Sequence, residues 1–487
     1  MAAESRAHAG ASAYRVITVG VDGLLLRAQM IDAAERTLDL QYYIFRGDET
    51  GLLLTTSLLR AADRGVRVRV LVDDGDTQPG DEQVLGLAAH PGIEVRVFNP
   101  FAYRGHSKLR RTVEFLLHKG RLDYRMHNKL MVADNSLALV GGRNIGNPYF
   151  QLDPEAQFAD DDVYAAGPIA SQLSATFDIY WNSALAIPAQ ALRPSQRAYP
   201  RIALHGAHAK ALAAQQVQRL SAGTIDYSKL IAGGEPYAGL TSGSLPLIWA
   251  QARVVCDSPE KQQVDKGSRA GLLMRKPVTE AAGEVRSELL LVTPYLVPAR
   301  EELRLLAGLR ARQVRVRILT NSLESAPDVA AQSGYLRKRV PLLRQGVELH
   351  EVRSQLGNTR GSGQSVAVSR FGNYALHAKL YIFDRRKLLI GSMNFDQRSM
   401  HINTEVGLII DSEDLAAQAA ARFEAMVLPA NSYMPTWGPP DSAGVMRLLW
   451  HTEESGKPII YRREPARSNW QRTKVRLLSW LPIASEL

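Results

Sequence analysis

Two stretches decide how this 487-residue chain folds: His127-Asn-Lys-Leu-Met-Val-Ala-Asp134 and His377-Ala-Lys-Leu-Tyr-Ile-Phe-Asp384. Both read His-x-Lys-x4-Asp, and both continue into a Gly-x-x-Asn element, at Gly141–Asn144 and Gly391–Asn394. The histidine and the asparagine are 17 residues apart in each copy. A single match arises by chance in roughly a few per cent of chains of this length. Two matches with the same continuation therefore indicate an internal duplication.

The residues before each motif repeat one order of elements. A buried strand, a helix with apolar side chains at helical spacing and an alternating strand follow one another at 39–45, 51–63 and 66–73, and again at 289–296, 301–311 and 314–321. Strand–helix–strand order of this kind builds a mainly parallel sheet with helices on both faces. We therefore predict an α/β fold of two similar lobes, each a mainly parallel sheet flanked by helices.

This repeat predicts four regions along the chain. The N-terminal lobe covers residues 1–185 with the first motif, and the C-terminal lobe covers 281–430 with the second. Residues 186–280 are expected to be a connecting segment of helices and loops, and 431–487 form a basic C-terminal tail. The role of residues 190–275 beyond connection is not predicted.

The composition is that of a globular protein with a basic surface. The chain is 45% hydrophobic and 22% charged, with a net charge of +10, which favours anionic partners such as nucleic acid or an anionic membrane. Cys256 is the single cysteine, so an intrachain disulfide is excluded. We find no run of 18 apolar residues, and the N-terminal residues have no apolar core, so neither a membrane-spanning helix nor a signal peptide is expected in this sequence.

The motif residues suit chemistry at a phosphate. On a strand, a histidine and a lysine two residues apart point to the same face. Four side chains are predicted to cradle one phosphate, the lysines by charge and the asparagines as donors: Lys129, Asn144, Lys379 and Asn394. One imidazole can then attack phosphorus while the other protonates the departing alkoxide. The pattern thus predicts phosphodiester cleavage at one site built from both copies.

Acidic residues are expected to complete the site. Glu405 and Asp162 follow the two Gly-x-x-Asn elements and are predicted to hold each imidazole by its other nitrogen. Asp134 and Asp384 complete the catalytic motifs, but five residues beyond lysine they point to the opposite face, so their role is supporting. Neither motif carries the carboxylate cluster of a divalent-metal site, so no metal or cofactor is expected.

Several segments together resemble the phospholipase D superfamily, and within it the bacterial cardiolipin synthases of the C-type class. The resemblance covers nearly the whole chain and is carried by the motifs and by residues 40–45, 125–132, 141–146, 180–183, 257–261, 391–396 and 475–483. It implies two phospholipase D-like lobes with the active site at their interface and a covalent phosphohistidine. His127 would be the nucleophile and His377 the acid/base.

The resemblance also implies the substrates and the setting. A phosphatidyl group would move from a phospholipid, phosphatidylglycerol or phosphatidylethanolamine, to phosphatidylglycerol to form cardiolipin. Peripheral association with an anionic bacterial membrane surface is expected, and nucleic acid is not. Two alternatives stay open: a hydrolytic phospholipase D releasing phosphatidic acid and, less favoured, a nuclease of the same superfamily. A non-catalytic lipid-binding module would need a broken motif, and both motifs are complete. The sequence shows no aromatic ladder of the kind that binds single-stranded nucleic acid, and this counts against the nuclease.

Two basic segments could meet a membrane. Residues 101–125 hold seven basic and several apolar side chains, and they either rim the site and bind anionic headgroups or form a solvated helix. Residues 462–481 alternate arginine and lysine with Trp470, Trp480 and aliphatic residues, and they either lie in a membrane interface or dock on the protein body as a terminal helix.

Overall fold

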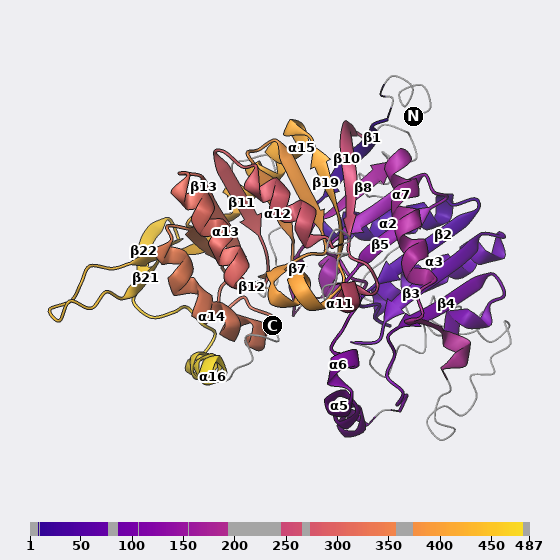
Figure 1. Ribbon diagram of the computed structural model, residues 1–487, viewed down its shortest axis with the longest axis horizontal. Helices are drawn as coiled ribbons and strands as arrows, with labels where there is room; N and C mark the ends of the chain where they lie inside the picture. Colours follow the sequence, from indigo (N-terminus) through magenta and orange to yellow (C-terminus); the bar gives the residue numbers. More distant parts are fainter. Residues whose placement is uncertain are drawn as a thin grey trace.

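The computed structural model describes residues 8, 10–75, 86–105, 107–153, 155–192, 245–264, 273–356 and 374–480. It has two lobes, each built on a sheet with helices (Figure 1). The elements of the first lobe are β1 (Ser12–Ile17), α2 (Gly20–Ala33), β2 (Thr37–Tyr42), α3 (Glu49–Asp63), β3 (Arg67–Asp73), β4 (Ile93–Phe98), α5 (Lys108–Leu117), α6 (Lys119–Leu122), β5 (Lys129–Ala133), β6 (Leu137–Gly141), β7 (Gln157–Ala159), β8 (Asp162–Ala166), α7 (Pro168–Trp181) and β9 (Ala186–Pro188), with short 3-10 turns at Leu87–Ala89, Asn147–Phe150 and Ala189–Ala191.

The remaining elements follow the same plan. They are β10 (Ile248–Cys256), α11 (Lys261–Val264), α12 (Arg275–Gly283), β11 (Glu288–Val292), β12 (Leu296–Val297), α13 (Arg300–Ala311), β13 (Arg315–Asn321), α14 (Val329–Arg344), β14 (Glu348–Val352), β15 (Tyr374–Leu376), β16 (Leu380–Phe383), β17 (Lys387–Gly391), β18 (Phe395–Asp396), a π-helical turn at Arg398–Ile402, β19 (Val406–Asp411), α15 (Glu413–Met426), β20 (Ser432–Trp437), β21 (Leu448–Glu454), β22 (Lys457–Tyr461) and α16 (Asn469–Trp480).

The two sheets match strand for strand. The first runs β9-β4-β3-β2-β5-β6-β8-β1, and the second runs β20-β14-β13-β11-β16-β17-β19-β10. Strand β10 occupies the place of β1, because each pairs antiparallel with the strand that follows the motif hairpin. The segment 186–280 is therefore not only helices and loops. Its strand β10 belongs to the second lobe, ahead of the expected boundary at residue 281, while residues 193–244 and 265–272 lie outside the described part.

The expected mainly parallel sheet is wrong, because both sheets are mixed. Within these two eight-stranded sheets, parallel pairing joins only β2–β3–β4 in the first and β11–β13–β14 in the second. The motif strands β5 and β16 each turn back within three residues, and Asp134 and Asp384 take φ near +50° there. Such a tight turn can only join antiparallel strands. The α/β class and the two similar lobes are confirmed.

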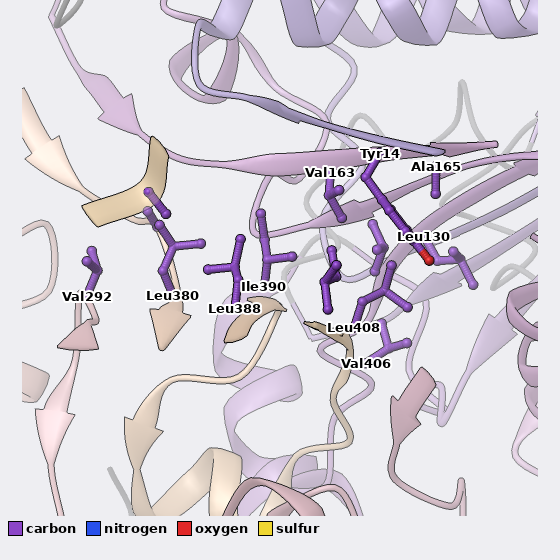
Figure 2. Close-up of a cluster of buried hydrophobic side chains, with 14 of the residues drawn as sticks. Tyr14, Leu130, Val163, Ala165, Val292, Leu380, Leu388, Ile390, Val406 and Leu408 are labelled. Carbon is purple, nitrogen blue, oxygen red and sulfur yellow. The ribbon is translucent and has the colours of Figure 1, made fainter. Parts of the chain in front are cut away.

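A shared core holds the lobes together. Figure 2 shows Leu130 and Val163 of the first sheet in one apolar cluster with Leu380, Ile390 and Leu408 of the second. Helices α7 and α15 contribute to this cluster, whereas α2 and α3 cover the other face of the first sheet, and α12, α13 and α14 cover that of the second. The edge strands β1 and β10 also pair antiparallel, so the two sheets are continuous.

Two helices stand away from this core at the lower edge of the molecule in Figure 1. Helix α5 has no buried side chain, and α16 has one, Val475, which is part of its packing on α14. Within the described residues, no helix is both long and apolar enough to cross a bilayer.

Candidate active site

The two motifs meet where the lobes exchange backbone hydrogen bonds. The N–H of His127 donates to the carbonyl of Thr404 in the second lobe at 2.9 Å. The N–H of His377 donates to the carbonyl of Ala159 in the first lobe at 2.7 Å, next to the parallel pairing of β7 with β15. The backbone of each histidine is thus hydrogen-bonded to a segment of the opposite lobe, and these bonds bring both motifs into one site.

Each imidazole is held by a carboxylate of the other lobe. Nδ1 of His127 lies 2.9 Å from Glu405 Oε2, and Nδ1 of His377 lies 2.5 Å from Asp160 Oδ2. All four side chains are buried. A carboxylate on Nδ1 fixes the ring and its tautomer, and it leaves Nε2 for chemistry.

The prediction that Asp162 orients a histidine is wrong. Its carboxylate instead lies 2.9 Å from Arg27 and 3.2 Å from Arg143, in a fully buried ion-pair cluster inside the first lobe. The sheet register explains the difference. Asp162 faces Gly141 across β6–β8, as Gly407 faces Gly391 across β17–β19. Asp160 and Glu405 each precede those strand positions by two residues, so Asp160 is the counterpart of Glu405.

The two lysines form a buried positive centre. Lys129 Nζ donates to the carbonyl of His127 at 2.6 Å, and Lys379 Nζ lies 3.0 Å from His377 Nδ1. Burial lowers the pKa of Lys379 to about 8. Burial also lowers the pKa of Lys129 well below its usual range, and the charge of Lys379 adds to that shift. Two cations this poorly solvated favour an anion between them.

The motif asparagines add neutral donors. Asn144 Oδ1 accepts the N–H of Ile44 at 3.1 Å, which leaves its Nδ2 available. The Oδ1 of Asn394 is buried without a hydrogen-bond partner among the described residues. Because an amide can be turned over without changing shape, Asn394 can present Nδ2 to a phosphate oxygen. Phosphate binding by Asn144 and Asn394 stays a prediction.

The pKa values of both imidazoles are lowered. Burial and the nearby Lys129 and Lys379 hold the pKa of His127 well below its usual range. Burial and Lys379 lower the pKa of His377 to about 3, although Asp160 opposes that shift. A neutral imidazole has the free lone pair that a nucleophile needs. A bound phosphodiester would offset the lysine charges and let one ring take up a proton.

The pKa values of the two carboxylates are shifted in opposite directions. Burial raises the pKa of Glu405 to about 7, even though Ser392 Oγ donates to it at 2.5 Å and Ser399 Oγ at 2.7 Å. For Asp160, burial is outweighed by His377 and Lys379, which hold its pKa well below the usual range. The duplicated site is therefore electrostatically asymmetric, with the permanent negative charge beside His377.

A buried ion pair supports Glu405 from behind, and sequence reasoning assigned it no role. Asp257 Oδ2 accepts the N–H of Glu405 at 3.0 Å and lies 2.9 Å from Lys261 Nζ. Lys261 also donates to the carbonyls of Ser399 at 2.7 Å and Asn403 at 2.8 Å. The signal was the spacing of four residues in Asp257-Ser-Pro-Glu-Lys261, which suits an ion pair.

Aromatic rings enclose the histidines, and these too were not predicted. The ring of Tyr43 lies 5.2 Å from that of His127 in an edge-on arrangement. Tyr149 lies edge-on at 5.2 Å from His377, and Phe158 stacks on it at 5.4 Å. Together with the acids, these rings restrict each imidazole to one orientation.

The motif aspartates lie at the far end of the hairpins. Asp134 accepts the backbone N–H groups of Glu35, Arg36 and Thr37. Asp384 accepts those of Arg286, Ser287 and Glu288. Each ties its hairpin to the start of the neighbouring strand, which agrees with a supporting role rather than contact with the substrate.

This fold and site coincide with a known family. A family model described as "Cardiolipin synthase, PLD-like domain" matches residues 28–181 and 278–427. The chain belongs to this cardiolipin synthase family of phospholipase D-like proteins. It is a phospholipid-modifying enzyme.

Individual relatives agree with that assignment. The chain is 36% identical to cardiolipin synthase C of Escherichia coli over 98% of its own length and 96% of the relative's. It is 34% identical to the major cardiolipin synthase ClsA of Bacillus subtilis over 35% of the chain and 33% of the relative. Among solved structures, phosphatidylserine synthase of Haemophilus influenzae matches with a TM-score of 0.56 at 12% identity, covering 89% of this chain and 91% of that one, and it shares the fold.

Proposed function

We propose that this enzyme transfers a phosphatidyl group to phosphatidylglycerol through a phosphohistidine and so forms cardiolipin. The observation that carries the proposal is the crossed pair of histidine–carboxylate contacts, at 2.9 and 2.5 Å, beside two buried lysines. Two oriented imidazoles beside one anion site suit a two-step displacement at phosphorus. The similarity to a cardiolipin synthase over nearly the full length supports phosphatidylglycerol as the acceptor.

In the first step, the lone pair of His127 Nε2 forms a bond to phosphorus. The bond from phosphorus to the leaving alkoxide breaks, and His377, protonated on Nε2 in the substrate complex, gives that oxygen its proton. Lys129 and Lys379 hold the non-bridging oxygens, and the ionised Asp160 stabilises the His377 imidazolium.

In the second step, the neutral His377 removes the proton from the hydroxyl of the acceptor. The acceptor oxygen forms a bond to phosphorus, and the phosphorus–nitrogen bond breaks and returns the electron pair to His127. His377 is protonated again, so the cycle closes without a co-reactant. Water in place of the acceptor would give phosphatidic acid by the same steps.

The substrates make a membrane the natural partner. Phosphatidylglycerol, and phosphatidylethanolamine as a second donor, reside in a bilayer, so the enzyme binds an anionic membrane surface peripherally. The net charge of +10 suits that surface.

The test uses purified full-length protein with phosphatidylglycerol vesicles, with and without phosphatidylethanolamine, and identifies the products. Cardiolipin supports the proposal, and phosphatidic acid alone replaces it with a hydrolase. Plasmid cleavage without lipid turnover would replace it with a nuclease. A ³²P-labelled phosphatidyl adduct on the protein, trapped by rapid detergent denaturation at neutral pH because a phosphorus–nitrogen bond is labile in acid, supports the intermediate and its position if it is present in the wild type and absent in His127→Ala.

A further inference from the structure

Helix α5 carries an apolar stripe that stays exposed on the protein. Leu109, Val113, Leu116 and Leu117 have the spacing i, i+4, i+7 and i+8, so they share one face of the helix. They are 74, 46, 67 and 74% exposed. An ordinary surface helix buries such a stripe against its own core.

The polar side of α5 faces the protein instead. The carboxylate of Glu114 accepts the N–H groups of Ala102 at 2.6 Å and Tyr103 at 2.8 Å. Arg111 packs over the ring of Phe101 at 4.2 Å and donates to the carbonyl of Asp74. The helix is thus anchored by its charged residues, and its apolar side faces outward.

Positive charge surrounds the stripe. Lys108, Arg110 and Arg121 are exposed on α5 and α6, and Glu114, the one acid of α5, is turned toward the backbone. A basic helix with an exposed aliphatic face matches the interface of an anionic bilayer, where the cations meet headgroups and the aliphatic side chains enter the acyl boundary.

We propose that α5 is a membrane-docking helix that inserts its Leu109–Leu117 stripe into the interface of an anionic phospholipid bilayer. This rests on the proposed function, since a lipid substrate must be taken from that bilayer. Helix α16 gives a second contact at the same edge (Figure 1), because Trp470 and Trp480 are 69 and 79% exposed. Tryptophan is enriched at membrane interfaces.

A second copy of the chain fits the stripe less well. Four aliphatic side chains bury only about 100 Å² each by area-transfer bookkeeping. A stable protein interface needs about 800 Å² from each partner. The basic rim would also repel an identical copy.

Docking through α5 would hold the site at a fixed height above the bilayer. Four residues separate Leu122, the end of α6, from His127, so at most about 18 Å lies between their Cα atoms. That connection is pinned, because Asp73 accepts the N–H of Met126 at 2.8 Å and lies 3.1 Å from Arg125. A headgroup at the bilayer surface is therefore within reach of the catalytic rings.

The experiment compares full-length wild type with Leu109→Ser/Leu116→Ser. The matched control is Ile179→Ser, which changes a 59% exposed side chain on α7. Co-sedimentation with phosphatidylglycerol-containing vesicles should fall about tenfold or more in the double variant and stay unchanged in the control. Lys108→Gln/Arg110→Gln should weaken binding at low salt and matter less at high salt.

Turnover separates docking from chemistry. Activity on phosphatidylglycerol vesicles should fall with binding in the double variant, while activity on short-chain, monomeric phosphatidylglycerol stays at the wild-type level. If no variant turns over either lipid, the proposed function fails, and sedimentation still tests the helix. Wild-type sedimentation of the double variant overturns the docking role. The docking role is also overturned if the wild type is a dimer in ultracentrifugation and the double variant alone loses that dimer while its vesicle binding persists.

Discussion

Asp160 of the first repeat lies 2.5 Å from Nδ1 of His377 in the second, and Asp162, two residues further on, does not approach either catalytic ring. One carboxylate of this acidic run therefore serves the chemistry, and another serves the fold. The third, Asp161, lies 3.2 Å from Arg422 of α15.

This division predicts different defects for two similar substitutions. Asp160→Asn should keep the fold but lower kcat by about 10²–10⁴, because the wrong tautomer of His377 is stabilised and its imidazolium loses a counter-charge. Asp162→Asn should mainly lower the melting temperature, since it weakens the buried contacts with Arg27 and Arg143. Thermal melts and turnover measured on both variants check this. A fully active Asp160→Asn enzyme would contradict the assignment.

The raised pKa of Glu405, about 7, predicts how stability varies with pH. Between its usual pKa of 4.5 and about 7, the folded protein holds a proton that the unfolded chain releases. This group's contribution to stability is therefore complete below pH 4.5 and declines as pH rises toward 7. Glu405→Gln stays neutral and lacks the decline.

The melting temperature of Glu405→Gln relative to wild type should consequently rise between pH 5 and pH 7.5, by roughly 1 °C or more. Glu413→Gln, on an exposed carboxylate, is the control and should show no such trend. A constant difference across the range would show that Glu405 is ionised throughout.

The ion pair behind Glu405 predicts a positioning effect. Asp257→Asn removes the charge that holds both Lys261 and the backbone of Glu405, so kcat should fall at least about tenfold with little change in KM. The pH–rate profile should shift with it, because the environment of Glu405 changes. Asp384→Asn, which weakens a distant hairpin tie, should lower stability without moving that profile. Equal profiles in wild type and Asp257→Asn would reduce the pair to a structural role.

The buried lysines predict stabilisation by an inorganic anion. Saturating phosphate should raise the melting temperature of the wild type, because it binds only the folded site. Lys379→Met should lose this shift, whereas Lys387→Met, on the surface of β17, should keep it. Calorimetry or a dye-based melt checks both. An undiminished shift in Lys379→Met would place the anion elsewhere.

The sequence was sufficient for those features that local pattern controls. The two motifs, their strands and the asparagines that follow them could be read from spacing, since side chains two apart on a strand share a face. The position of Glu405 beside a catalytic ring could also be read. The pairing direction of the strands could not, because the periodicity of a strand is the same in parallel and antiparallel sheets.

Asp160 was missed for a related reason. The acid of the first lobe stands 16 positions after Asn144, and Glu405 stands 11 positions after Asn394, so counting along the chain does not align them. Counting across the sheet does, since Gly141 and Gly391 fix the register. Of the aromatic rings around the histidines, Tyr43 directly follows β2, Tyr149 lies in the 3-10 turn Asn147–Phe150, and Phe158 lies in the three-residue strand β7. These segments are too short for a periodic pattern to identify them.

The exchange of acids between the lobes has an evolutionary consequence. Each repeat supplies one catalytic histidine, but the carboxylate that orients this histidine comes from the other repeat. Neither repeat alone therefore contains a complete histidine–carboxylate pair. A change at Glu405 alters the first repeat's histidine, and a change at Asp160 alters the second's. Selection on either repeat therefore depends on the sequence of the other, and the two repeats must evolve together. The equivalent positions now hold different acids, Asp160 in the first repeat and Glu405 in the second, yet each acid still serves the histidine of the other repeat.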